Sequence, residues 1–370
     1  MGSEMCIRDS VTATENATVE AESFAASLGL AFGGAAAFSF SGAGADAIND
    51  INNRVDASIS NSTVSSSADV DVLATNTSSI DATVVAVSAA VSGGTFAGAG
   101  SIGASIARNR IGDLDASNAN RHRTTAAITD SSVTATTDIN VIADANETIE
   151  TVSAAGAVAI AVGIGAAAAG SGAEATSLIA GDVSAIVDGS HLTAGQDVSV
   201  HADSQSQITR AEAVGAALAV SLNAASVAVS LVSNDIQNEV TATISGDATD
   251  RVSAGRAVVV DADATRAEID GVLAVTASVS GGLRGLAGGG IDIDNTINNT
   301  VTSTISGALP IRASGVSVRA DEDADVSADA AQVTVSVSLG AALGVALVDN
   351  RITSTTVSYT HLTLPTILLV

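Results

Sequence analysis

The chain contains no lysine and no tryptophan, and only 2% of its 370 residues are aromatic. A compact core normally depends on large aromatic and aliphatic side chains, each of which buries much apolar area. The apolar residues here are instead mostly small, and small side chains suit backbones that approach closely in many thin layers. The composition therefore favours a solenoid or an array over a compact globule.

Positive charge is scarce. All 14 basic residues are arginine, against 40 acidic residues, and the net charge is −26. Nucleic acids and anionic membranes are bound through clustered Lys and Arg, so we expect no nucleic-acid partner and no membrane insertion by this segment. The single cysteine, Cys6, excludes an internal disulfide and leaves the redox compartment open.

The two ends differ in composition from everything between them. Residues 1–10 and 357–370 hold the only cysteine, both methionines and the only tyrosine. The strings MCIRDS and VSYTHLTLPT within them resemble translated linker sequence. We therefore expect non-native, linker-like ends at 1–10 and 357–370, one repetitive region over 11–356, and a longer parent protein.

A repeat of about sixty residues runs through the chain. The pattern N-x-I-x-N-x-V occurs at 49–55, 234–240 and 295–301, with weaker copies between and after these. The central isoleucines mark the repeat units: Ile51, Ile111, Ile179, Ile236, Ile297 and Ile352. A fixed period of this length is typical of solenoids and domain arrays.

Each unit has the same internal order. The Asn motif leads into an alternating segment such as 240–244, then a turn, a V-x-V-x-A segment such as 258–262, an acidic turn such as 321–325, and a long Ala/Val/Gly stretch. Alternation of Val, Ile and Thr with period two predicts β-strands. We expect an all-β fold, a parallel β-helix or β-solenoid with two or three coils per unit. A tandem array of small β-sandwiches is the alternative.

Two uncharged runs permit a different interpretation. Residues 154–173 and 214–233 are long enough to span a bilayer as helices. Ala and Gly contribute little membrane affinity, however, and the equivalent stretch of the next unit contains Arg284. Buried strands of small residues explain all the copies together.

The recurring asparagines predict a structural ladder. Asn tolerates left-handed geometry at turns, and its amide can bond to a stacked neighbour. The predicted ladder consists of Asn49, Asn53, Asn234, Asn238, Asn295 and Asn299.

This order of Asn motif, turn, V-x-V-x-A and Ala/Gly-rich stretch resembles the repeats of large bacterial exoproteins of the leukotoxin-like filamentous adhesin type. It is also similar to haemagglutinin-like passenger domains of secreted β-helix proteins. The resemblance covers nearly all of 11–356. It implies an extracellular or outer-surface location and a role in adhesion or scaffolding, with a protein or glycan of a host or neighbouring cell as the partner. It supplies no catalytic residues.

Acidic residues at a predicted turn form a weak candidate for calcium. Asp321, Glu322, Asp323 and Asp325 lie close together in the sequence. Neither the glycine-rich nonapeptide of calcium β-rolls nor an EF-hand loop is present. Solvated turns therefore compete with calcium binding, and no other cofactor is expected.

The unit after Ile111 is the longest, and its excess falls at 113–123. Insertions in solenoids emerge as loops, often on the binding face. Arg121, His122 and Arg123 form the tight basic cluster of this acidic chain. We therefore predict a contact loop there for an anionic partner, a glycan or a neighbouring chain.

No motif predicts catalysis, and we do not expect an enzyme. Gly98-x-Gly100-x-x-Gly103 matches the dinucleotide fingerprint but lies in a glycine-rich stretch without the required strand–helix context. The sequence favours a rigid adhesin segment that spaces or presents other parts. A polysaccharide-active enzyme on a β-helix, or a calcium-stabilised or ice-binding module with its T-x-T pairs, remains an alternative.

Overall fold

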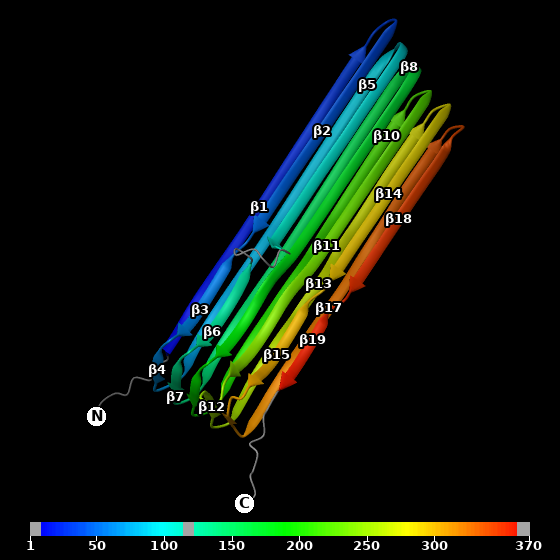
Figure 1. Cartoon of the computed structure of the whole chain (residues 1–370). Helices are drawn as coiled ribbons and strands as arrows, with labels where there is room; N and C mark the ends of the chain where they lie inside the picture. The colour runs from blue at the N-terminus through cyan, green and yellow to red at the C-terminus, as the bar shows by residue number, and fades with distance from the viewer. Residues whose placement is uncertain (1–8, 114–121, 361–370) are drawn as a thin grey trace, which may run out of the picture.

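A computed structural model describes residues 9–113 and 122–360, and its regular elements are all β-strands (Figure 1). They form one 14-stranded sheet and one five-stranded sheet, and the strands of each pair run parallel. The expectation of an all-β, parallel, solenoid-like fold is thus confirmed. Within these residues, no helix provides an apolar stretch that could cross a bilayer.

Long outward strands form one wall of the structure. Most of these strands have about two dozen residues, and each pairs with the equivalent strand of the next unit. They are β1 (Asp9–Phe32), the first half of β5 (Val70–Gly112), the first half of β8 (Ile139–Asp188), β10 (Val198–Val220), β13 (Ala257–Gly281) and β17 (Gly315–Val337).

Return strands form the opposite wall. The chain reverses in tight turns at the far tip, and at Gly163 (φ +138°) an added Cβ would lie 1.9 Å from the carbonyl oxygen of Gly94, so the turn requires glycine. The return strands are β2 (Ala36–Ile51), the second halves of β5 and β8, β11 (Asn223–Gly246), β14 (Arg284–Ile297) and β18 (Ala341–Ile352).

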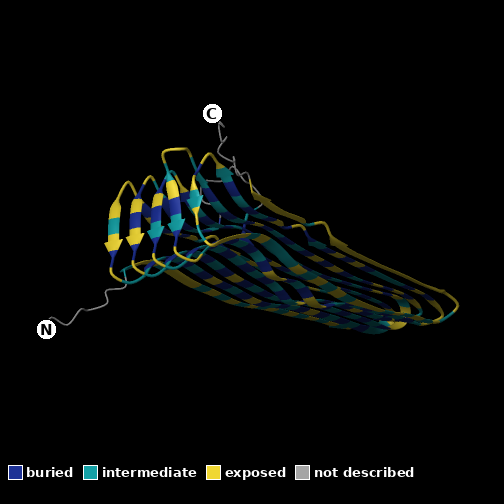
Figure 2. Cartoon of the chain, turned by 90° about the horizontal axis from the view of Figure 1, so that it is seen from below, coloured by how far each residue is buried: buried dark blue, intermediate teal, exposed yellow. Residues whose placement is uncertain are grey.

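The near end carries shorter strands. The return wall continues through β3 (Arg54–Ser60), β6 (Arg123–Thr129), β15 (Thr300–Gly307) and β19 (Thr355–Thr360). The five-stranded sheet then closes this end, as the short arrows of Figure 2 show. Its strands are β4 (Thr63–Ser66), β7 (Ser132–Ala135), β9 (His191–Ala194), β12 (Arg251–Ala254) and β16 (Ile311–Arg312).

The isoleucines that mark the units lie beside one another in the return wall. Ile51 pairs with Ile111, Ile111 with Ile179, and so on in order through Ile236, Ile297 and Ile352. Sheet neighbours are therefore one whole unit apart along the chain. The expectation of two or three coils per unit is wrong, and so is the β-sandwich array, because one sheet runs through all the units.

The core changes in character along the strands. Near the closed end it consists of Val, Ile and Ala, and the middle is dominated by the isoleucine columns. Towards the far tip a core cluster contains alanine alone. Small residues there let the two walls approach closely, so the interior narrows from the closed end to the tip.

The strand bounds bear on three local expectations. The uncharged runs 154–173 and 214–233 form strands of β8, β10 and β11 and the turns between them, as expected, and not helices. The predicted acidic turn at 321–325 is the interior of strand β17. Strands β1 and β19 also extend into the segments predicted to be linker-like, from Asp9 and up to Thr360.

Candidate functional site

In the first Asn column, side-chain amides bond from one unit to the next. The amide of Asn49 donates to Asn109 Oδ1, that of Asn234 to Asn295 Oδ1, and that of Asn295 to Asn350 Oδ1, each at 2.8 Å. In the middle unit Ser177 stands in the column and pairs with Thr151 at 2.9 Å. Side chains of successive units are thus joined from Asn49 to Asn109, and from Asn234 through Asn295 to Asn350.

The second Asn column bonds to the backbone of the preceding unit. Asn238 Oδ1 accepts from Gly181 N–H at 3.0 Å, and Asn299 Oδ1 accepts from Asn238 N–H at 2.9 Å. At the equivalent place His122 Nδ1 accepts from Asn53 N–H at 3.2 Å. These contacts lie where the return wall bends. They provide hydrogen-bond acceptors for backbone N–H groups that the neighbouring strands do not pair.

The predicted reason for these asparagines was wrong in one respect. Among the described residues, positive φ outside glycine occurs at Asn61 and Asp130, and not at the ladder positions. Asn234, Asn295 and Asn299 are fully buried. The asparagines therefore serve as interior hydrogen-bonding groups and not as turn formers.

A buried polar layer surrounds the second column. His122 Nε2 lies 3.3 Å from Glu147 Oε1, and both side chains are almost inaccessible to solvent. Because His122 Nδ1 accepts a hydrogen bond, the ring proton lies on Nε2, which is 3.3 Å from Glu147 Oε1 and 3.0 Å from the Asn76 amide nitrogen. Ser206 donates to the second oxygen of Glu147 at 2.9 Å. A paired buried acid of this kind is costly to disturb.

Of the predicted contact cluster, the structure describes His122 and Arg123. His122 is buried and paired with Glu147, so it offers nothing to a partner, and this part of the prediction is wrong. Arg123 is half-exposed but bonds to Asp56 at 3.2 Å across the sheet. Arg121 lies outside the described residues.

An aspartate column follows the outer side of the outward wall. Asp144, Asp203, Asp263 and Asp321 are paired in register on β8, β10, β13 and β17. Beside it, His201 and Asp261 pair in the neighbouring column. Within the described part of the chain, His201, Asp261 and Asp263 are the group whose ligand atoms lie close enough to share a metal ion, all within 4.8 Å.

Burial and mutual repulsion act on this column. Burial raises the pKa of Asp263, the charges of Asp261 and Asp321 raise it further, and His201 and Arg319 oppose the rise. The pKa of Asp144 is raised for the same first reason, with Asp203 adding to it and His201 opposing it. The charged column therefore costs folding energy at neutral pH, and a bound cation would offset that cost.

The four residues of the predicted calcium site face opposite sides of strand β17. Successive residues of a strand face opposite sides, so Glu322 points inward, where its Oε1 accepts from Asn299 at 3.0 Å. Asp321 instead pairs with Arg319 on the outer side. Glu322 thus cannot join Asp321, Asp323 and Asp325 around one ion, and the predicted four-residue site is not formed.

The threonine pairs do not form a continuous ladder. Thr243 bonds to Thr304 at 3.1 Å, but the next residue in register is Tyr359. In the preceding unit Ile186 occupies the column. The flat array of threonines that an ice-binding face requires is therefore absent at these positions.

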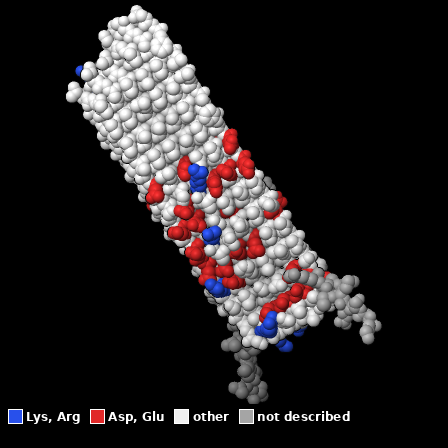
Figure 3. All heavy atoms as spheres, turned by 180° about the vertical axis from the view of Figure 1, so that it is seen from behind, with Lys and Arg blue, Asp and Glu red and all other residues white. Residues whose placement is uncertain are grey.

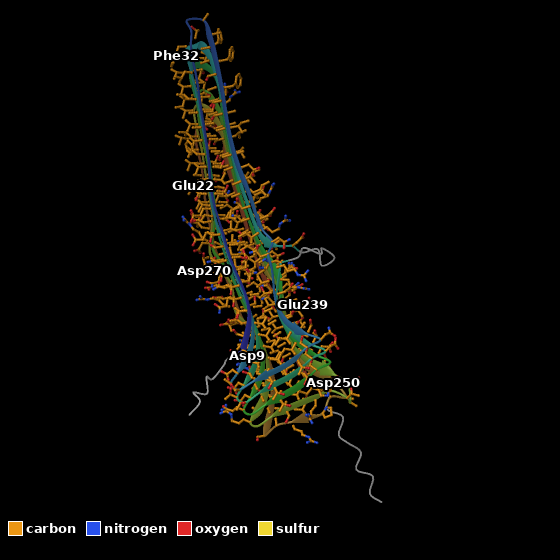
Figure 4. All side chains as sticks on the ribbon, turned by 90° about the vertical axis from the view of Figure 1, so that its left-hand side faces the viewer. Asp9, Glu22, Phe32, Glu239, Asp250 and Asp270 are labelled. Carbon is orange, nitrogen blue, oxygen red and sulfur yellow. The ribbon has the colours of Figure 1, made fainter. Side chains whose placement is uncertain are left out.

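The far half of the molecule carries almost no charge. Figure 3 shows the acidic side chains gathered over one half, and in Figure 4 Glu22 lies midway along the strands and Phe32 near the tip. Arg284 is the one charged residue in this uncharged half, which comprises residues 24–45, 85–105, 154–173, 214–230, 275–291 and 331–346.

The uncharged half has an unusual partition between inside and outside. Serines face the interior, and some of them bond in pairs, such as Ser88 with Ser101 at 2.6 Å and Ser226 with Ser278 at 2.8 Å. Large apolar side chains face outward, among them Phe40 and Ile102. Grooves of about 780 and 710 Å³ lie between such ridges on the return wall, over a floor of Gly and Ala.

Sequence reasoning missed the buried polar layer and the exposed apolar half. Glu147 stands in an alternating strand between the inward-facing Ala145 and Ile149, and that phase alone could have revealed its burial. The uncharged stretches were noticed, but they were assigned to a buried interior. Their alternation places only every second residue inside.

Comparisons with protein-family profiles, with curated proteins and with solved structures found no match.

Proposed function

We propose that this chain is a structural segment of a secreted or surface-attached bacterial adhesin. In this proposal each unit of about sixty residues forms one coil of a parallel β-helix. The segment acts as a rigid scaffold that spaces or presents other parts of a longer protein at the cell surface. A surface protein or glycan of a host or neighbouring cell is the proposed partner of the whole assembly.

The observation that supports this proposal is the regular register of the return strands from unit to unit. Isoleucine stands beside isoleucine across all six units, and the Asn columns link successive units by side-chain bonds. Units that contact only their neighbours can be added or removed without changing the rest. Rigidity that extends unit by unit is what a spacer requires.

The two large grooves favour this function over a polysaccharide-active enzyme. Glycoside chemistry commonly uses two carboxyl groups at a groove. The grooves on the return wall are lined by Phe, Ile, Leu, Ala and Gly, with Arg284 as their charged residue and no carboxylate.

Removal of one unit tests the proposal. Val198 and Val258 are equivalent, so deletion of 198–257 brings β13 against β8 in the register that β10 now holds. We expect a folded protein whose stack is narrower by about 4.8 Å, with unchanged strand length, in small-angle scattering. A deletion variant that unfolds, or that collapses to a rounded particle, would contradict an additive scaffold. Deletion of 198–227, which is half a unit, serves as the control that must disrupt the stack.

A further inference from the structure

The outer face of the return wall in the uncharged half shows a regular alternation of large and small residues. Each strand has two consecutive outward-facing positions here, which lie in register from strand to strand. In every strand one of these positions holds the larger residue and the other holds Gly or Ala. The pairs are Phe40 and Gly42 in β2, Gly100 and Ile102 in β5, Ala168 and Gly170 in β8, Ala225 and Val227 in β11, Leu286 and Gly288 in β14, and Ala341 and Leu343 in β18.

In β2, β8 and β14 the next outward positions repeat this arrangement farther from the centre. Phe38 is matched by Gly44, Ala166 by Gly172, and Arg284 by Gly290. The centre of the alternation, between Phe40 and Gly42, is also the centre of the uncharged segment 36–45 of β2. A two-fold axis through this centre, parallel to the wall and across the strands, would place Phe40 of one copy over Gly42 of another.

We propose that this face binds a second copy of the chain, wall against wall, with the strands of the two copies antiparallel. Each large side chain then fills the space over a small residue of the other copy. The grooves of about 780 and 710 Å³ receive the ridges of Phe38, Phe40 and Leu286. A two-fold contact of this kind is self-complementary, as a closed dimer requires.

Area and charge favour a second copy as the occupant. Six strands about 4.8 Å apart and about nine residues long cover roughly 860 Å² of one face. Stable interfaces bury about 800 Å² on each partner. The antiparallel arrangement also directs the two acidic halves to opposite ends, whereas a parallel one would set them side by side.

A lipid bilayer is the less favourable occupant. The outermost strands of the stack, β1 with β2 and β17 with β18, each have one open edge in the described structure. Unpaired backbone groups of an open sheet edge are not tolerated in hydrocarbon. In a dimer formed face to face, these edges stay in water.

Sedimentation velocity of the full chain over a concentration series tests the proposal. We expect a dimer that dissociates on dilution. Ile102→Arg should weaken association at least tenfold. The matched control is Val162→Arg on the opposite wall, since Val162 is 65% and Ile102 66% exposed, and it should leave the dimer unchanged. A wild-type chain that stays monomeric up to its solubility limit, or a dimer that Ile102→Arg leaves intact, would overturn the proposal.

Exchanging the large and the small residue of β2 distinguishes a loss of packing between the two copies from a loss of the fold. A Cβ at Gly42 would meet only Ile102 O, at 4.0 Å, so Gly42→Phe fits the single chain. It should abolish the dimer by opposing Phe40 of the partner, and Phe40→Gly combined with it should restore dimerisation. Failure of this double variant to dimerise would overturn the two-fold pairing. Wild-type monomers that float with phosphatidylcholine vesicles would instead assign the face to lipid, against the proposal.

Discussion

The acidic half and the uncharged half of the molecule are built from the same strands but partition their residues in opposite ways. In the acidic half, Ile and Val columns fill the interior and Asp and Glu face outward. In the uncharged half, Ala and paired Ser fill the interior, and Phe, Leu, Ile and Val face outward. The same backbone register therefore supports two kinds of surface, one suited to water and one suited to a partner.

A buried polar layer lies inside the acidic half, between the Val-rich core near the closed end and the isoleucine columns. In this layer the second Asn column and the His122–Glu147 pair take the place of apolar contacts. Buried polar groups cost energy unless each is hydrogen-bonded. Such a layer therefore makes the one register in which all its groups are bonded more stable than any other. We infer that this layer fixes how the units align, while the apolar columns supply most of the stability.

The largest expected effect is in this buried polar layer. His122→Ala removes the imidazole partner of the buried Glu147 carboxylate and the acceptor of Asn53 N–H. We expect a loss of about 3–5 kcal/mol in the free energy of unfolding, measured by chemical denaturation. His191→Ala, at an exposed histidine 3.8 Å from Asp250, is the control and should change it by less than about 0.5 kcal/mol. Equal effects of the two substitutions would show that the polar layer does not set the stability.

The Asn ladder should have the next largest effect. Asn295→Ala removes the acceptor of Asn234 and the donor to Asn350, both in the stack interior. Each buried amide left unpaired costs about 1–3 kcal/mol, so denaturation should show a loss in that range. The exposed Asn16 provides a control substitution to Ala on an outer strand. A loss below that of the control would mean that the ladder is not structural.

The serine pairs of the uncharged half should respond differently to single and double changes. Ser226→Ala leaves the buried Ser278 hydroxyl without its partner, and a loss of about 1 kcal/mol is expected. The double change Ser226→Ala with Ser278→Ala removes both hydroxyls and should be nearly neutral. If the free energy of unfolding falls in the double variant by the sum of the two single losses, the serines are not acting as a matched pair.

The smallest effect concerns the aspartate column of the acidic half. Because burial raises the pKa of Asp263, the folded state holds its proton more tightly than the unfolded state does. This group then adds stability at low pH that is lost as pH rises through its folded-state pKa. Asp263→Asn should therefore stabilise the chain at pH 7 by less than about 1 kcal/mol and have no effect well below pH 3.8. Thermal melts at the two pH values measure this, with Asp292→Asn as the control. An Asp263→Asn variant that is less stable than the wild type at pH 7 would contradict the predicted direction of this effect.

Much of the fold was predictable because its signals are periodic. Period-two alternation identified the strands, and the recurrence of Ile51, Ile111 and Ile179 identified the units and their order in the sheet. The number of coils per unit was not predictable from these signals. The long Ala/Gly stretches contain no residue that marks the single turn at the tip, where Gly163 is one glycine among many.

The sites were predicted less well than the fold, for a physical reason. Residues that are adjacent in the sequence of a strand face opposite sides of the sheet, so Glu322 and Asp321 point in opposite directions. The His201, Asp261 and Asp263 group joins different units, and only the register of β10 against β13 brings it together. The sequence predicts a contact role for His122 because it lies in an insertion between Arg121 and Arg123, but its buried partner Glu147 lies 25 residues farther along the chain.

Thiol reactivity on one strand tests the central claim, that the uncharged half is covered by a second copy and the acidic half is not. In a Cys6→Ser background, Val227→Cys and Glu239→Cys place single thiols on the outer side of β11, one in each half. The account predicts that the maleimide labelling rate at position 227 falls as protein concentration rises, while the rate at position 239 stays constant. A constant ratio of the two rates across all concentrations would contradict it.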